Sequence, residues 1–264
     1  MVDTNQLPGL ASMTRDQLLG MMTELTGVRS VELKINIPAD QRMALARLGI
    51  DPLEGKIREV TFFDTPDLTL FHNGVVVRAR RTQGADDDTV VKLRPAKPAE
   101  LPPKVQASKN LKVEMDVTRG SYVVSASLKG SRSAGAVLKA TSGERPLEQL
   151  FTKEQRAFFA EHSPAVGWDD LIPLGPIFIV LLKFVPTGYS RRITLEQWHY
   201  PGEVPLVEMS TKTTPKHAIG VANEAVEFLR GLGLSASGTQ EPKTRKALEF
   251  FAPSRKGTRS RRRR

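Results

Sequence analysis

Charged residues alternate with apolar residues in six short stretches of the sequence. Successive side chains of a β-strand point to opposite faces, so this period of two predicts strands with one apolar and one charged face. The stretches are 31–35, 77–80, 91–94, 111–116, 192–196 and 207–212. The chain is therefore expected to build a sheet whose charged faces come together.

The charged faces hold more cations than an ordinary solvent-exposed sheet face. Their bases are Lys34, Arg78, Arg80, Lys92, Arg94, Lys112, Arg192 and Lys212, and their acids are Glu32, Glu114, Asp116, Glu196 and Glu208. A typical alternating strand places its polar face in water, and like charges directly opposite each other are unfavourable. Arginines gathered in this way repel one another unless an anion lies among them. The pattern predicts a polyanion and its metal ions as ligands.

Composition limits the other possibilities. The 264 residues, 39% of them hydrophobic, suffice for one large domain or two small ones. The absence of cysteine excludes disulfides and thiolate metal sites and fits the cytoplasmic location that we expect. We expect no signal peptide and no membrane span, because the longest apolar segment, 171–185, contains two prolines and is shorter than the ~20 residues required.

The net charge of +10 is concentrated at the C-terminal end. Seven positive charges and no acid follow Pro253, which leaves +3 for the rest of the chain. Residues 253–264 are predicted to be a disordered basic tail. Such a tail can bind nucleic acid or another polyanion by counterion release, or it can serve only as a solubilising end.

Eight strands and several helices follow from the patterns along the chain, which indicates an α+β fold. The predicted strands are 31–37, 56–64, 74–81, 89–94, 111–118, 177–184, 191–199 and 205–213, and the predicted helices are 13–26, 38–49, 147–161, 215–230 and 242–251. We expect a closed eight-stranded antiparallel β-barrel, with charges inside and helices covering the outside. Residues 1–28 would be an N-terminal helical extension, 29–252 the barrel domain, and about 125–170 a helical insertion within it.

The motifs also resemble those of the CYTH-domain family, the triphosphate tunnel metalloenzymes. The matching segments are Ser30-Val31-Glu32-Leu33-Lys34, Phe63-Asp64-Thr65-Pro66-Asp67-Leu68, Gly74 to Arg81, Val91-Lys92-Leu93-Arg94, Val207 to Lys212, and Phe228 to Leu234 followed by Lys243. The resemblance implies a triphosphate tunnel with bound Mg²⁺ or Mn²⁺. Substrate-binding residues would be Lys34, Arg78, Arg80, Lys92, Arg94, Lys183 and Arg192, metal ligands Glu32, Glu114, Glu196 and Glu208, and catalytic residues Glu32 and Lys34.

Two departures from the family pattern keep the function open. Ser30 and Ser210 stand where the family has metal-binding glutamates, and a neutral hydroxyl is a weaker ligand for Mg²⁺ than a carboxylate. The leading hypothesis is a metal-dependent phosphohydrolase acting on inorganic, nucleoside or thiamine triphosphate. The alternatives are a catalytically weak polyphosphate- or nucleotide-binding module and a class IV-type adenylate cyclase.

Overall fold

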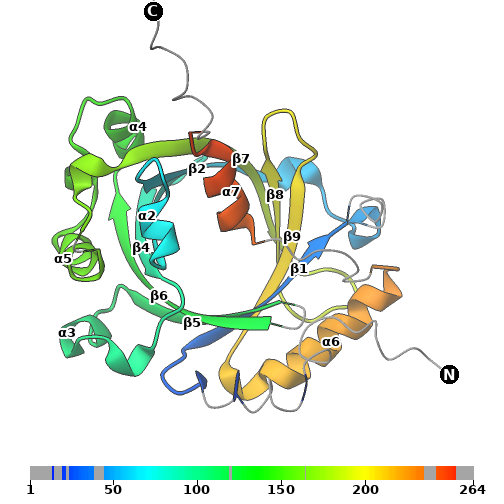
Figure 1. The fold of residues 1–264 in the computed structure, drawn as a ribbon. Helices are drawn as coiled ribbons and strands as arrows, with labels where there is room; N and C mark the ends of the chain where they lie inside the picture. The colour runs from blue at the N-terminus through cyan, green and yellow to red at the C-terminus, as the bar shows by residue number, and fades with distance from the viewer. Residues whose placement is uncertain are drawn as a thin grey trace, which may run out of the picture.

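The protein forms a closed barrel of nine strands with helices packed around it (Figure 1). The computed structural model describes residues 14, 20–21, 24–38, 45–118, 121–163, 165–234 and 242–253. The predicted helix 13–26 lies largely outside these residues, half of the predicted helix 38–49 lies outside them, and the basic tail lies outside them apart from Pro253. No helix in the described ranges is both long and apolar enough to cross a membrane.

The strands close the barrel in the order β1-β5-β6-β4-β3-β2-β7-β8-β9. Their bounds are β1 Ser30–Ile37, β2 Lys56–Asp64, β3 Val75–Thr82, β4 Asp87–Leu93, β5 Leu111–Thr118, β6 Ser121–Arg132, β7 Ile172–Phe184, β8 Ile193–His199 and β9 Leu206–Thr213. Neighbouring strands pair antiparallel except β1 and β5, which are parallel. The predicted α+β fold and closed barrel are confirmed, whereas the predicted count of eight strands and the purely antiparallel pairing are wrong.

The strand that sequence analysis missed is β6, which occupies the start of the predicted helical insertion. Its middle is rich in serine, alanine and glycine, which have low strand propensity. These small residues let helix α5 approach closely: a Cβ on Gly130 would lie 2.6 Å from the amide oxygen of Gln155. Buried Gln155 in turn donates to the backbone carbonyls of Thr89 and Leu128, at 3.1 and 3.0 Å. Tertiary packing therefore makes this segment a strand.

The helices are shorter and more numerous than predicted. Their bounds are α2 Thr69–His72, α3 Pro103–Gln106, α4 Ala136–Thr141, α5 Lys153–His162, α6 Ala218–Gly231 and α7 Lys243–Phe251, with short 3₁₀ turns between them. The predicted helix 147–161 is a 3₁₀ turn, Leu147–Leu150, followed by α5, which begins at a capping box formed by Thr152 and Gln155. The predicted helices 215–230 and 242–251 are confirmed as α6 and α7.

The outer face of the barrel carries the apolar residues of the alternating strands. In β1 the odd-numbered residues Val31 to Ile37 are buried in the core clusters, whereas Glu32 and Lys34 face the interior. Helix α6 covers β1, β8 and β9 through Leu229, and α5 covers β4 and β6 through Phe158 and Phe159. Figure 1 shows α4, α5 and α6 outside the ring of strands. This coat allows the charged faces to turn inward.

Helix α7 is different because it packs inside the ring of strands (Figure 1, red). Its buried residues Ala247 and Leu248 form a cluster with Val60 and Ile179, which line the barrel interior, and with Phe62. The inward faces of the strands therefore change from charged to apolar along the barrel. Helix α7 fills the apolar end.

A buried carboxylate holds the turn that connects β2 to β3. Asp64 is 1% exposed and accepts hydrogen bonds from the backbone N–H groups of Thr65, Leu70 and Phe71, at 2.8, 2.9 and 3.0 Å. Since unsatisfied buried N–H groups are costly, this aspartate fixes the entrance to the arginine-bearing strand β3.

We expect Asp64→Ala to lower the free energy of unfolding by about 3 kcal/mol, because three buried donors lose a charged acceptor. Exposed Asp51, whose side chain accepts from Leu53 N at 2.8 Å, provides the control, and Asp51→Ala should cost about 1 kcal/mol. Urea unfolding followed by circular dichroism measures both values. Equal losses in the two variants would contradict the structural role assigned to Asp64.

Candidate functional site

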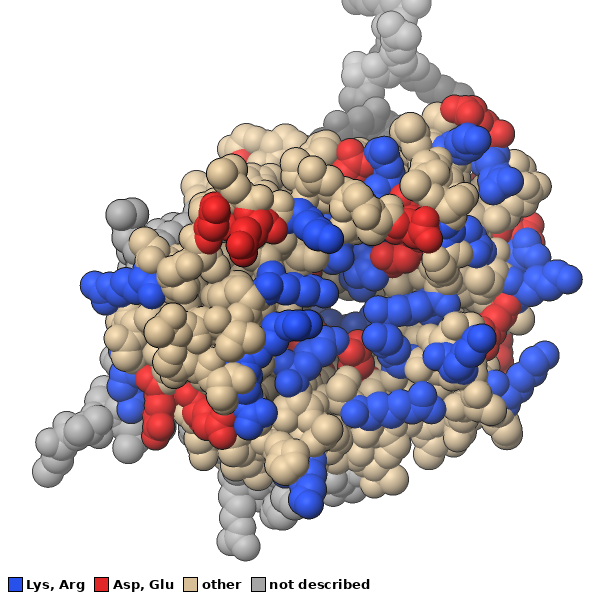
Figure 2. Space-filling model, turned by 180° about the vertical axis from the view of Figure 1, so that it is seen from behind, with Lys and Arg blue, Asp and Glu red and all other residues tan. Residues whose placement is uncertain are grey.

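A cavity of about 630 Å³ runs inside the barrel and is lined mainly by charged side chains. Figure 2 shows it as a hollow in one face of the molecule, rimmed by lysine and arginine. All nine strands and the first turn of α7 contribute lining residues. This volume lies in the range of small-molecule binding sites.

Cations outnumber anions in the cavity. The lining bases are Lys34, Arg58, Arg78, Arg80, Lys92, Arg94, Lys112, Lys129, Lys183, Lys212 and Lys243, and the lining acids are Glu32, Glu114, Asp116, Glu196 and Glu208. Eleven cations against five carboxylates give the lining a formal charge of +6. An interior of this kind attracts a multiply charged anion.

Asp116 is the most enclosed of the lining acids, at 2% exposure. Its carboxylate contacts Lys34 at 2.9 Å, Arg94 at 3.1 Å and Lys92 at 3.5 Å. Burial opposes the charge of Asp116, but the three cations outweigh burial and hold its pKa well below the usual range. Burial likewise opposes the charge of Lys34, and Asp116 and Glu32 together raise its pKa. Asp116 therefore organises Lys34 of β1, Lys92 of β4 and Arg94, which directly follows β4.

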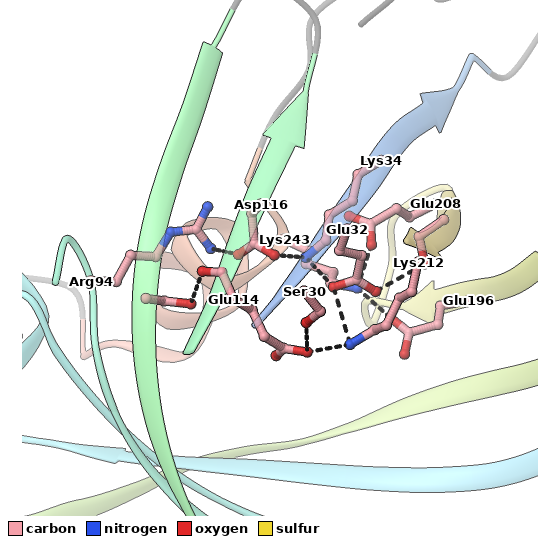
Figure 3. A network of polar contacts seen from close by, with 12 residues as sticks. Ser30, Glu32, Lys34, Arg94, Glu114, Asp116, Glu196, Glu208, Lys212 and Lys243 are labelled. Atoms are coloured by element: carbon pink, nitrogen blue, oxygen red, sulfur yellow. Dashed lines mark hydrogen bonds and ion pairs between the residues drawn. The ribbon is translucent and has the colours of Figure 1, made fainter. Parts of the chain in front are cut away.

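Ser30 and Ser210 each donate a hydrogen bond to a carboxylate. Ser210 Oγ lies 3.1 Å from Glu32. Ser30 Oγ lies 3.3 Å from Glu114 (Figure 3). Lys212 bridges the same two acids, at 2.6 Å from Glu114 and 3.9 Å from Glu32. The serines thus support the remaining glutamates on β1 and β5.

Glu196 and Glu208 are cross-strand partners on β8 and β9, and both are held by one lysine from α7. The ammonium group of Lys243 contacts Glu196 and lies 2.6 Å from Glu208 (Figure 3). It also lies 5.2 Å from the ring centre of Trp198, whose indole N–H donates to Glu196. Burial opposes the charge of Glu196, yet Lys243 lowers its pKa to about 2. Glu196 is therefore ionised.

Three lining bases lack enough anionic partners. Burial, reinforced by Arg80, lowers the pKa of Arg78 to about 10, and its Nε has no hydrogen-bond partner among the described residues. Burial is also the main cause that lowers the pKa of Lys92 to about 8 and that of Lys129 to about 8. Burial disfavours the charged forms of these three side chains, and an anion in the cavity would stabilise those charged forms.

The barrel brings most of the predicted site residues together. Glu32, Lys34, Arg78, Arg80, Lys92, Arg94, Glu114, Lys183, Glu196 and Glu208 all line the cavity. Arg192 does not, because β8 begins one residue later and the exposed arginine lies next to Lys183 near the edge. Sequence analysis left out Arg58, Lys129 and Lys243 as lining residues.

The lining acids do not form a preassembled metal cage. Among the described residues, no three aspartates, glutamates or histidines are close enough together to hold a metal ion. However, Mg²⁺ commonly takes only one or two carboxylates from the protein and completes its shell with phosphate oxygens and water. Glu196 and Glu208, which reach the same Lys243 nitrogen, fit an ion of this kind.

Solved structures share this fold. One is a candidate adenylyl cyclase from Hippeastrum with a dominant triphosphatase activity, at 15% identity and a TM-score of 0.56, covering 81% of this chain and 93% of that one. Another is a candidate adenylate cyclase from Bacillus halodurans, at 14% identity and a TM-score of 0.58, covering 83% and 97%.

The chain therefore has the tunnel fold that its resemblance to the CYTH-domain family predicts. At sequence identities of 14–15%, these comparisons show a shared fold and nothing further. No family model matches the sequence, and no curated protein matches it.

The lowered lysine pKa values predict an unusual dependence of stability on pH. Between pH 8 and about 10.4, the unfolded chain binds more protons at Lys92 and Lys129 than the folded protein does, so the free energy of unfolding should rise with pH. Lys92 alone should contribute about 2–3 kcal/mol. The raised pKa of Lys34 acts only above this window.

Urea unfolding at pH 7.5, 8.5 and 9.5 tests this expectation. Lys92→Met should flatten the rise, and exposed Lys153→Met should retain it. A free energy of unfolding that falls over this range in the wild-type protein would refute the expected confinement of the lysines.

Proposed function

We propose that the cavity binds the triphosphate group of inorganic triphosphate or of a nucleoside or thiamine triphosphate, and that the protein hydrolyses it with Mg²⁺ or Mn²⁺. The main observation that supports this proposal is a cavity inside the barrel lined by eleven cations and five carboxylates. Triphosphate bears about four negative charges at neutral pH, which this excess of cations can balance. The tunnel fold shared with the Hippeastrum protein supports the choice of substrate class.

The arginines and lysines of the cavity would contribute to triphosphate binding in different ways. Arg78, Arg80 and Arg94 offer planar guanidinium groups that can bind phosphate oxygens in a bidentate manner. Lys92 and Lys183 add positive charge that follows the ligand. Arg78 makes the strongest case, because its buried Nε lacks a partner in the described part of the chain. An anion oxygen would satisfy this donor.

Hydrolysis requires a water molecule aligned with the terminal phosphorus. Water attacks that phosphorus, the bridging P–O bond breaks, and phosphate and diphosphate leave. Glu32 would orient the water, since its carboxylate is fixed by Ser210 and Lys34 on the cavity wall. Lys34 would stabilise the charge that develops on the phosphoryl oxygens. A divalent ion held by Glu196 and Glu208, with Glu32 and Glu114 as further candidate ligands, would supply additional charge neutralisation.

The binding prediction compares two arginines of the same strand. We expect Arg78→Met to raise the Kd for tripolyphosphate by about 10- to 100-fold, because it removes a charge-assisted contact. Arg81, which is paired with Glu59 and does not line the cavity, is the matched control, and Arg81→Met should change the Kd by less than about twofold. Isothermal titration calorimetry without metal measures both. Equal affinities for wild type and Arg78→Met would contradict the assigned ligand position.

The catalytic prediction concerns Glu208. In the presence of Mn²⁺ the protein should release phosphate from tripolyphosphate, and Glu208→Gln should lower kcat by about 100-fold or more through lost charge stabilisation. Tripolyphosphate binding by this variant should persist. A phosphate-release assay, with Arg81→Met as control, provides the measurement.

The rival functions give different outcomes in the same assays. A binding module is favoured by two observations: each of the five lining acids contacts a lysine, and serines stand at positions 30 and 210. Such a module would bind tripolyphosphate without hydrolysing it. A cyclase would form cyclic AMP from ATP. Failure to bind tripolyphosphate at all would eliminate both the proposed hydrolase and the binding module.

A further inference from the structure

Lys243 occupies the place between two carboxylates where a cation is needed. It is the first residue of α7, and its ammonium group contacts Glu196 on β8 and Glu208 on β9. Its side chain is only 17% exposed. Without a cation between them, the two carboxylates on adjacent strands would repel each other, because water screens charges inside the barrel only in part.

The position of Lys243 is fixed by the rest of α7. Ala247 and Leu248 are buried in the cluster inside the barrel, and Lys246 pairs with Glu203 at 2.9 Å while lying over the ring of Tyr200. The helix therefore presents Lys243 to the acids at a high effective concentration. A free ion must compete with a cation that is already attached to the chain.

We propose that Lys243 is an internal cation that occupies the Glu196–Glu208 pair until a divalent metal ion displaces it. The inference uses the metal of the proposed function but not its substrate. Metal binding alone is then weak, because the ion must first break two charged contacts of Lys243. A phosphate ligand in the cavity offers the released ammonium group new partners, since Lys243 lines the same cavity. Triphosphate and metal should therefore bind cooperatively.

The test measures Mn²⁺ binding to the whole protein in the absence of any phosphate, by calorimetry or by the electron paramagnetic resonance signal of free Mn²⁺. Lys243→Met should bind Mn²⁺ at least about tenfold more tightly than wild type, since it frees both carboxylates. Lys243→Arg, which keeps a cation at this position, should bind as weakly as wild type.

Two control variants distinguish the competition between Lys243 and the metal ion from a general effect of positive charge in the cavity. Lys183→Met removes one positive charge from the same cavity without freeing Glu196 or Glu208. Lys246→Met removes a charge from the same helix outside the cavity lining. Both should bind Mn²⁺ within about threefold of wild type, because charge at a distance is screened. Equal gains in Lys243→Met and Lys183→Met, or no gain in Lys243→Met, overturn the proposal.

Two further measurements keep the test decisive. If circular dichroism shows that Lys243→Met does not fold, Lys243→Gln, which retains hydrogen-bond donors, takes its place with the same expected gain. In the wild type, Mg²⁺ should change the fluorescence of Trp198, which lies beside Lys243, and Trp198→Phe should abolish the change. Neither measurement uses triphosphate, so both results remain interpretable if the proposed function fails. The tripolyphosphate titrations likewise remain valid if metal binding proves independent of Lys243.

Discussion

The enclosure of an excess of positive charge is the constraint on which the rest of the structure depends. Each lining carboxylate has at least one lysine or arginine partner, yet the lining still carries a formal charge of +6. Burial is the largest cause that lowers the pKa values of Arg78, Lys92 and Lys129, and neighbouring cations lower them further. A closed barrel can hold this unfavourable arrangement only because its apolar outer coat stabilises the fold independently. Perturbed pKa values gathered in one cavity are typical of functional sites.

The sequence predicts the alternating strands well because both faces of each strand leave a clear signal. Predicted strand 111–118 matches β5 at both ends, and its charged positions all line the cavity. The signal fails where the inward face changes character. Arg58 was missed because the next inward positions of β2 are Val60 and Phe62, which belong to the apolar end. Arg192 has the right parity for the inward face but precedes the first residue of β8, so periodicity alone placed it inside.

Long-range packing accounts for the remaining errors. Lys129 was missed together with β6, whose small residues are explained by the close approach of Gln155 rather than by strand propensity. Lys243 lies on a helix that was predicted correctly, but helical periodicity does not reveal that its first turn enters a barrel. The parallel pairing of β1 with β5 also depends on how the barrel closes. Side chains alternate between the two faces of a strand whether its neighbour is parallel or antiparallel, so the sequence pattern does not reveal the direction of pairing.

The two serines shift the balance between binding and chemistry. If Ser30 and Ser210 were glutamates, the formal charge of the lining would fall from +6 to about +4, close to the four negative charges of triphosphate. With serines, the cavity already overbalances the anion before any metal arrives, and an added divalent ion increases the surplus. A divalent ion alone should therefore bind weakly in this cavity, and a bound triphosphate, which offsets the surplus of positive charge, should favour its binding. The same surplus makes a lysine tethered by α7 an effective competitor for the Glu196–Glu208 pair, because the surrounding cations lower the affinity of these carboxylates for any free ion.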